Sequence, residues 1–130
     1  DPANWNPAGV PGEQDELNTK IELWRRTAKE TLPVRLAELA ERYGFSCGRV
    51  CIKHNRSNWG SCSAKGNINL NLNLVRLPKE LQDYVMLHEL CHLRHMDHGT
   101  SFHRLLDELC RKEGIDKDSM RKQLKSYILL

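Results

Sequence analysis

His88-Glu89-Leu90-Cys91-His92 sets two histidines four residues apart around a glutamate. On an α-helix, residues at i and i+4 lie on one face a turn apart, so both imidazoles can reach the same metal ion. Glu89 lies about 100° further round the helix, where its carboxylate can reach a water molecule beside the metal. Zinc binds imidazole nitrogen well at low coordination number. The stretch therefore predicts a helix that carries a zinc site, with His88 and His92 as ligands.

A catalytic zinc site needs a third protein ligand and one open position. His95 follows His92 at i+3 and is rotated off the line of the histidine pair. His98 lies too far round for one continuous helix, but a helix that breaks near residues 96–97 would let the chain fold back, with Gly99 as a flexible point. We expect His98 to be the third ligand. The reserve candidates in the next amphipathic run are His103 and Glu108.

Several stretches around this motif strengthen the zinc interpretation, because their order along the chain matches that of a known family. They are Asn58-Trp59-Gly60-Ser61-Cys62-Ser63, Asn67 to Leu74, Leu77-Pro78, Asp83-Tyr84-Val85, His88 to Leu93, and His98-Gly99-Thr100-Ser101-Phe102. The series resembles the YgjP-like metallopeptidase domain, a relative of the SprT-like and WLM zinc proteases, over about residues 19 to 110. In that family the histidine that opens the H-x-x-x-F segment is the third zinc ligand, and it corresponds here to His98.

The resemblance implies a zinc metallopeptidase that hydrolyses peptide bonds in peptide or protein substrates. Glu89 would act as the general base toward a zinc-activated water, and Tyr84 and His103 are candidates for the donor that stabilises the oxyanion. Two alternatives stay open: a DNA-associated protease like some SprT-like relatives, or a module that binds nucleic acid or protein and uses zinc only as a staple. A hydrolase with a substrate other than a peptide is a further alternative. Glu89 argues against a staple, because a structural zinc site needs no adjacent carboxylate.

Composition fits one globular domain: 130 residues, 39% of them hydrophobic and 28% charged. No apolar run approaches the roughly 18 residues that a membrane span requires. The five cysteines are best explained as free thiols in a reducing, cytoplasmic setting, and a second zinc site at Cys47, Cys51 and Cys62 is not favoured. Residues 1–15 predict a flexible acidic tail, residues 16–130 the zincin-like domain. Because the chain begins at Asp1, we expect a processed form or a fragment.

Hydrophobic spacing predicts an α+β domain with helices at both ends of a short β-sheet. A helix is expected from residue 16, ended or kinked at Pro33, and then a second helix that Gly44 closes. Strands are expected at 49–54 and 59–62, and over 67–74, where leucine and isoleucine alternate with asparagine. The asparagine row would face either solvent or substrate. Pro78 then opens the motif helix, and helices are expected at 101–110 and within 117–130, whose apolar end would pack on the core.

Charge is unevenly distributed although the net charge is only +3. No aspartate or glutamate occurs between Tyr43 and Lys79, whereas Arg49, Lys53, Arg56, Lys65, Arg76 and Lys79 are basic. Such a block favours an acidic substrate or a phosphate backbone. Few aromatic residues interrupt it, which counts against base stacking. Nucleic acid is therefore a secondary expectation beside the peptide substrate.

Overall fold

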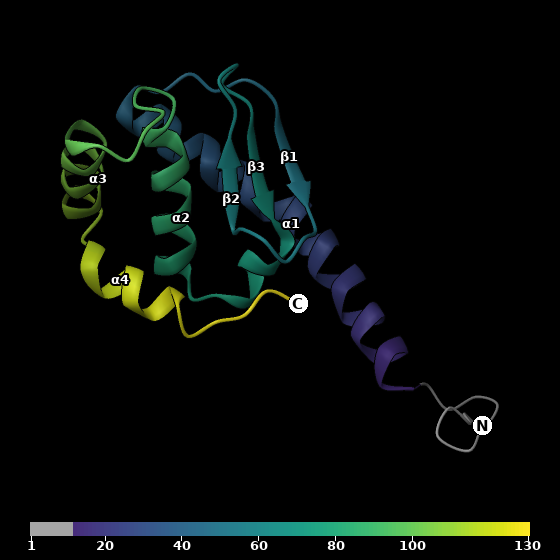
Figure 1. Cartoon of the computed structure of the whole chain (residues 1–130). Coiled ribbons are helices and arrows are strands. Elements are labelled where there is room, and N and C mark those ends of the chain that lie inside the picture. The colour runs from purple at the N-terminus through teal and green to yellow at the C-terminus, as the bar shows by residue number, and fades with distance from the viewer. Residues whose placement is uncertain (1–11) are drawn as a thin grey trace.

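The computed structural model describes residues 12–130 as an α+β domain, which confirms the predicted fold class (Figure 1). In chain order the elements are α1 (Glu13–Tyr43), β1 (Val50–Lys53), β2 (Gly60–Cys62), β3 (Ile68–Asn71), the 3₁₀ helix η2 (Leu72–Arg76), α2 (Lys79–Cys91), α3 (Thr100–Lys112) and α4 (Lys117–Leu124). α1 begins inside the segment predicted as a tail, so residues 13–15 are helical. The rest of that predicted tail, 1–11, lies outside the described residues.

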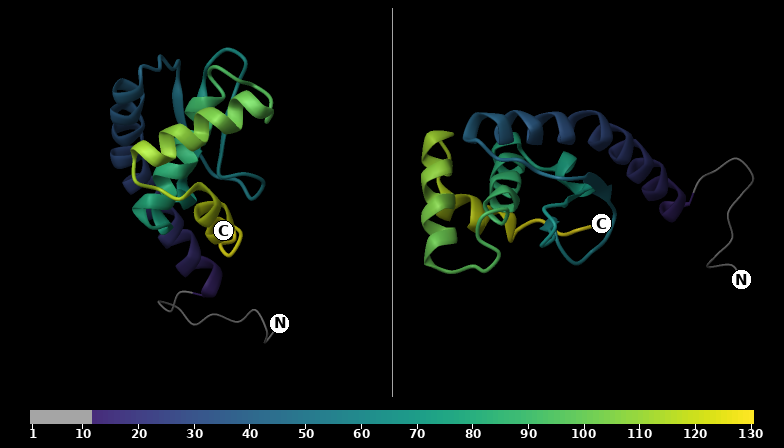
Figure 2. Two further views of the ribbon diagram at one scale, coloured as in Figure 1. Left: turned by 90° about the vertical axis from the view of Figure 1, so that its left-hand side faces the viewer. Right: turned by 90° about the horizontal axis from the view of Figure 1, so that it is seen from above.

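The three strands form one sheet in the order β1-β3-β2. β1 is parallel to β3, with Val50 opposite Ile68, and β2 is antiparallel to β3, with Gly60 opposite Leu70. Residues that face each other on neighbouring strands share a side of the sheet, and Ile68 and Leu70 are fully buried. The helices therefore cover the apolar side. α1 crosses behind the sheet and α2 stands beside its β2 edge (Figures 1 and 2).

α1 is one continuous helix through Pro33, so the prediction of two separate helices is wrong. A proline inside a helix costs about 3 kcal/mol because it removes one hydrogen bond and crowds the preceding turn. The apolar residues on both sides of Pro33 share one buried stripe, made of Ala28, Leu32, Leu36 and Leu39. Burying that stripe outweighs the local cost. Gly44 ends the helix with φ 73°, which confirms its predicted capping role.

The asparagine row is structural, so the prediction that it faces solvent or substrate is wrong for its second half. The strand ends at Asn71, whose side-chain oxygen accepts a hydrogen bond from the Asn73 backbone N–H at 2.9 Å and starts η2. Asn71 and Asn73 are both buried. Asn69, which stays in the strand, donates to Ser61 Oγ at 3.3 Å. The asparagine side chains therefore form hydrogen bonds with buried backbone groups that a longer regular strand would have paired with its neighbour.

The segment after α4 runs beneath α2 toward η2 (Figure 1). The Asn73 side chain donates to the Leu130 backbone oxygen at 3.1 Å and accepts from the Leu130 N–H at 3.0 Å. Arg76 donates to the Ile128 carbonyl at 2.7 Å. Tyr127 packs against the core as predicted, whereas Ile128 is exposed. Polar anchors therefore hold this end in addition to the apolar packing of Tyr127.

Among residues 12–130, no helix has the length and apolar character needed to cross a membrane.

An ion-pair cluster ties α1 to α2 and to the end of α3. The Arg35 guanidinium donates to both Asp83 carboxylate oxygens at 2.9 Å, and its Nη2 lies 3.7 Å from Glu113. Glu113 also accepts a hydrogen bond from Tyr43 at 2.6 Å. Asp83 is almost fully buried, so its charge depends on this one bidentate partner. The cluster fixes the helix that carries the histidine motif against its backing helix.

Replacing Asp83 by asparagine should therefore lower the free energy of unfolding by roughly 2–3 kcal/mol, because it leaves the Arg35 guanidinium half-buried without its main counter-charge. The measurement is urea unfolding at neutral pH. Glu22→Gln is the control, because it breaks the Glu22–Arg25 pair on the exposed side of the same helix and should leave the unfolding midpoint in place. Equal midpoints for the two variants would contradict a stabilising role for the cluster.

Candidate metal centre

α2 ends just before the second motif histidine and presents both histidines from its last turns. It ends at Cys91, and the His92 N–H donates to the Glu89 carbonyl at 3.2 Å. The expected break near residues 96–97 is therefore placed too late. The chain turns at once and brings His98 back, so that His98 Nε2 lies 3.0 Å from His92 Nε2 and 3.2 Å from His88 Nε2. The structure brings together the three histidines predicted from the sequence.

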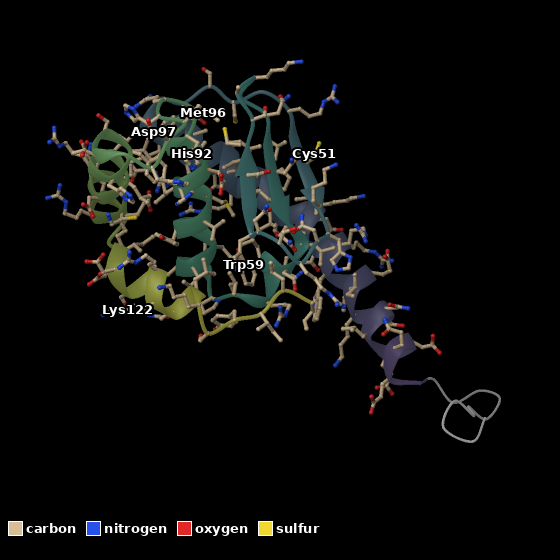
Figure 3. All side chains as sticks on the ribbon, viewed as in Figure 1. Cys51, Trp59, His92, Met96, Asp97 and Lys122 are labelled. Carbon is tan, nitrogen blue, oxygen red and sulfur yellow. The ribbon has the colours of Figure 1, made fainter. Side chains whose placement is uncertain are left out.

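Gly99 contributes to this turn for a reason other than backbone flexibility. Its φ of −79° is open to any residue, so the predicted need for a flexible point is wrong. Its N–H donates to the Asp97 carboxylate at 3.0 Å, and a Cβ on residue 99 would lie only 2.9 Å from the same oxygen. Asp97 thus folds the turn beside His98, and a larger residue at position 99 would require the Asp97 side chain to shift. Figure 3 shows Asp97 and Met96 beyond the His92 end of α2.

The three imidazoles fit a zinc ion. Their ligand nitrogens all lie within 4.8 Å of one another. Zn–N bonds of about 2.0–2.1 Å in a tetrahedral arrangement place ligand nitrogens roughly 3.3–3.4 Å apart, close to the 3.0 and 3.2 Å found here. Three neutral imidazoles are also the donor set of known catalytic zinc sites. Distance and chemistry therefore both suit zinc.

Surrounding groups hold the rings in a state that can bind a metal. His92 Nδ1 lies 2.9 Å from the His95 carbonyl oxygen, and donation to it leaves Nε2 free as a ligand. The imidazole of His95 is not part of the cluster. Burial, reinforced by the neighbouring histidines, lowers the pKa of His88 to about 4. His88 is therefore neutral at pH 7, as a zinc ligand must be.

Phe102 forms the floor of the cluster, a role that the sequence alone did not show. It is fully buried, and its ring centroid lies 4.9, 4.5 and 4.9 Å from those of His88, His92 and His98. It stacks on His92 and meets the other two rings edge-on. In the H-x-x-x-F segment, Phe102 follows His98 by four residues and lies in the first turn of α3. That spacing was the only signal for this role in the sequence.

Glu89 lies beside the cluster with a carboxylate that is largely withdrawn from solvent. Only 6% of the residue is exposed, and this burial raises the pKa of its carboxyl to about 7. A Cβ on Gly60 would lie 3.1 Å from Glu89 Cγ and Oε2 and 3.2 Å from the Asn69 carbonyl oxygen. The glycine of the W-G-S-C stretch therefore makes room for the glutamate of the helix motif. A buried carboxyl with a pKa near neutrality suits proton transfer.

The reserve candidates lie outside the cluster. His103 is on the exposed side of α3, with its ring 6.4 Å from that of His98. Glu108 is further along α3 and pairs with Lys112 at 3.1 Å. Tyr84 is buried on α2 and meets His88 edge-on at 6.4 Å between ring centroids, and its role as an oxyanion donor stays a prediction. Cys51 and Cys62 oppose Asn69 and Ile68, so they lie on opposite sides of the sheet and do not converge with Cys47 on one metal.

Known proteins show which family this sequence and fold belong to. The family model of the YgjP-like metallopeptidase domain matches residues 3–126. The metallopeptidase zymogen abylysin of Pyrococcus abyssi aligns with a TM-score of 0.56 and 25% identity, over 71% of this chain and 94% of that chain. The zymogen jannalysin of Methanocaldococcus jannaschii aligns with a TM-score of 0.62 and 23% identity, over 73% and 94%. Curated protein sequences give no match. With its family match spanning nearly the whole domain, this chain belongs to the YgjP-like metallopeptidase family.

Proposed function

We propose that this protein is a zinc-dependent peptidase in which His88, His92 and His98 hold the metal and Glu89 is the general base. The observation that carries the proposal is the convergence of three imidazole nitrogens beside a buried carboxyl group. A zinc site that only stapled the fold would not need a carboxylate held there at the cost of burial. The proposed domain spans residues 13–130, and its five free thiols favour a reducing, cytoplasmic location.

Glu89 performs the proton transfers in this proposal. Zinc, when bound, supplies a Lewis acid that polarises the scissile carbonyl and acidifies the attacking water. The Glu89 carboxylate accepts the proton of that water as the water attacks, and then donates it to the departing amine. Gly60 lies against the glutamate side chain, since a Cβ at residue 60 would come within 3.1 Å of Glu89 Cγ and Oε2. His98 completes the cluster from the more exposed side, where a substrate can approach.

An extended peptide substrate is proposed to bind along the edge of β2 that faces away from β3. Within residues 12–130, β2 pairs only with β3. The N–H of Asn71 donates to the Trp59 carbonyl and that of Ser63 to the Asn67 carbonyl, both at 2.9 Å. Since antiparallel pairing alternates, Gly60 and Cys62 direct their backbone groups away from β3. A substrate strand could pair with these groups and pass the buried Glu89.

Metal-dependent hydrolysis of an unfolded protein tests the proposal. The zinc-loaded chain should cleave casein, lose that activity in a chelator such as 1,10-phenanthroline, and regain it when zinc is restored after dialysis. Cleavage that persists in the chelator would point to another active site or a contaminating protease. A chain that holds zinc tightly but cleaves no peptide would favour the binding-module alternative.

A second candidate function, action on substrates bound to nucleic acid, rests on the basic block. Arg49, Lys53, Arg56 and Lys65 are all exposed, and none of them forms an ion pair within the described part of the chain. Lys53 lies on the outer side of the sheet, away from α1. Unpaired basic side chains on one segment can bind a polyanion.

If the block binds DNA, the Kd should rise steeply with salt, and Arg56→Glu together with Lys65→Glu should abolish binding. Fluorescence polarisation of a labelled duplex at increasing salt measures this, with a poly-glutamate peptide as a second polyanion. The matched control reverses two exposed lysines on α1, Lys20→Glu with Lys29→Glu, for the same change in net charge. Equal losses in the two double variants, or no binding at low salt, would leave the block as a solvated surface.

A further inference from the structure

A cavity of about 310 Å³ adjoins the metal centre on the side of Glu89. Its lining comes from α2, from residues 57–60 at the start of β2, and from the end of α4, and Figure 1 shows how these elements are arranged. His88, Glu89 and Leu124, the last residue of α4, are among the residues that line it. A volume near the lower limit for ligand pockets suits one large side chain better than a whole small molecule.

The walls of this cavity are mainly apolar. Trp59 and Leu124 are half-buried and pack against the core, and Tyr84 and Val85 are buried on α2. Glu89 is the only carboxylate among the described residues that line it, and no lysine or arginine does so. An acidic side chain placed here would lose its hydration and meet the Glu89 carboxylate, whereas an aliphatic or aromatic one would bury its surface.

The cavity also lies where a bound peptide would place a side chain. The strand edge that could pair with substrate begins at Gly60, and Gly60 itself lines the cavity together with Glu89. Side chains of an extended peptide alternate in direction, so one that is paired at Gly60 can point one side chain down between β2 and α2. We propose that the cavity receives an apolar substrate side chain next to the scissile bond, so that Leu124 and Trp59 set the specificity of this enzyme.

This inference rests on the proposed peptidase function and adds the class of substrate to it. A hollow beside His98, the cluster histidine that does not line the first cavity, provides an internal contrast. It has a volume of about 560 Å³ and is lined by His98, Gly99, Thr100, His103, Arg104 and Asp107, none of which is a large apolar residue. The hollow beside His98 has no comparable apolar wall, so only the cavity beside Glu89 should select for apolar side chains.

Leu124 is the residue through which the inference is best tested. It is half-buried at the end of α4, on a different element from the three histidines, so its replacement can reshape the cavity without removing a metal ligand. Leu124→Ala should widen the cavity, and Leu124→Phe should narrow it. Leu105→Ala is the matched control, because Leu105 is a half-buried leucine on α3 that packs against the core but does not line the cavity.

The experiment is a peptide set in which one residue on each side of the cleaved bond varies among Leu, Phe, Ala, Asp and Lys. For zinc-loaded wild type, kcat/KM at one of the two positions should be about tenfold or more higher for Leu than for Ala, and lowest for Asp. Leu124→Ala should move the preference from Leu toward Phe, and Leu124→Phe should move it toward Ala. Leu105→Ala should keep the wild-type ratios. A flat profile at both positions, or equal ratios in all variants, overturns the inference.

A binding measurement separates this inference from the proposed function. Zinc-loaded Glu89→Gln protein should bind a labelled Leu-containing peptide about tenfold more tightly than its Ala or Asp counterpart, and Leu124→Phe in the same background should remove that difference. If wild type cleaves no peptide but this binding preference is found, the peptidase function fails and the apolar site stands. If peptides are cleaved but neither kcat/KM nor binding distinguishes Leu from Asp, the peptidase function stands and the apolar site fails.

Discussion

Replacing Glu89 by glutamine is expected to lower peptide hydrolysis by a factor on the order of 10² to 10⁴ while zinc content stays near that of wild type. Glutamine has the same size and shape as glutamate but cannot accept the proton of the attacking water. The carboxylate is not one of the three clustered ligand groups, so its loss should leave the metal in place. Casein or peptide hydrolysis and metal analysis of the same sample measure both quantities.

Stability sharpens this prediction. Glu89 is buried, and burial raises the pKa of its carboxyl to about 7. The ionised carboxylate therefore destabilises the folded state, whereas the neutral amide of a glutamine at this position does not. In the metal-free protein, Glu89→Gln should therefore melt at or slightly above the wild-type temperature. The conservative control is Glu108→Gln, an exposed glutamate on α3. Comparable activity losses in both variants, or loss of zinc from Glu89→Gln, would refute the role of a dedicated base.

Replacing His98 by alanine should remove most of the bound zinc, whereas His103→Ala and His95→Ala should keep it. Only His98 places its Nε2 within 3.2 Å of the ligand nitrogens of both other histidines. His95 contributes its backbone carbonyl to His92, which alanine preserves, and His103 lies outside the cluster. Loss of one of three ligands should lower the zinc affinity by well over the 10–100-fold that is typical when a residue hydrogen-bonded to a ligand is replaced.

The measurement is a competition between each zinc-loaded variant and a chromophoric chelator of known affinity, followed at equilibrium. His98→Cys is an informative companion, since a thiolate can also bind zinc and should restore part of the affinity. Zinc retained by His98→Ala together with zinc lost from His103→Ala would reverse the ligand assignment.

The sequence predicted correctly those structural features that are determined by residues close together in the chain. The i, i+4 spacing of His88 and His92 needed only a helix, and the Gly44 cap followed from chain geometry. Predictions failed where distant partners decide the outcome. α1 continues through Pro33 because the core on both sides of it is shared, and Asn73 is buried because the Leu130 backbone meets it, 57 residues away along the chain.

The candidate site shows the same division. His98 could be proposed from its position in the chain and from the family resemblance, but its convergence with the other histidines required the folded turn. Gly60 gave no sign in the sequence that its missing side chain leaves room for Glu89. Nor did Asp83 reveal that it pairs with Arg35 on another helix. Such contacts join residues far apart in the chain, and single-sequence patterns carry no information about them.

The turn that carries His98 has a thermodynamic consequence. Two ligands lie at the end of a packed helix, but the third lies in the exposed stretch 96–99, where the Gly99 N–H donates to the Asp97 carboxylate. Fixing such a segment costs conformational entropy, which the free protein pays with little return. The bound ion acts as a removable cross-link between residues 88, 92 and 98, and its binding free energy is partly consumed in ordering the loop. The apparent zinc affinity therefore depends on how well ordered the loop is in the metal-free protein. Mutations in residues 93–97 that change this order should change the zinc affinity as well.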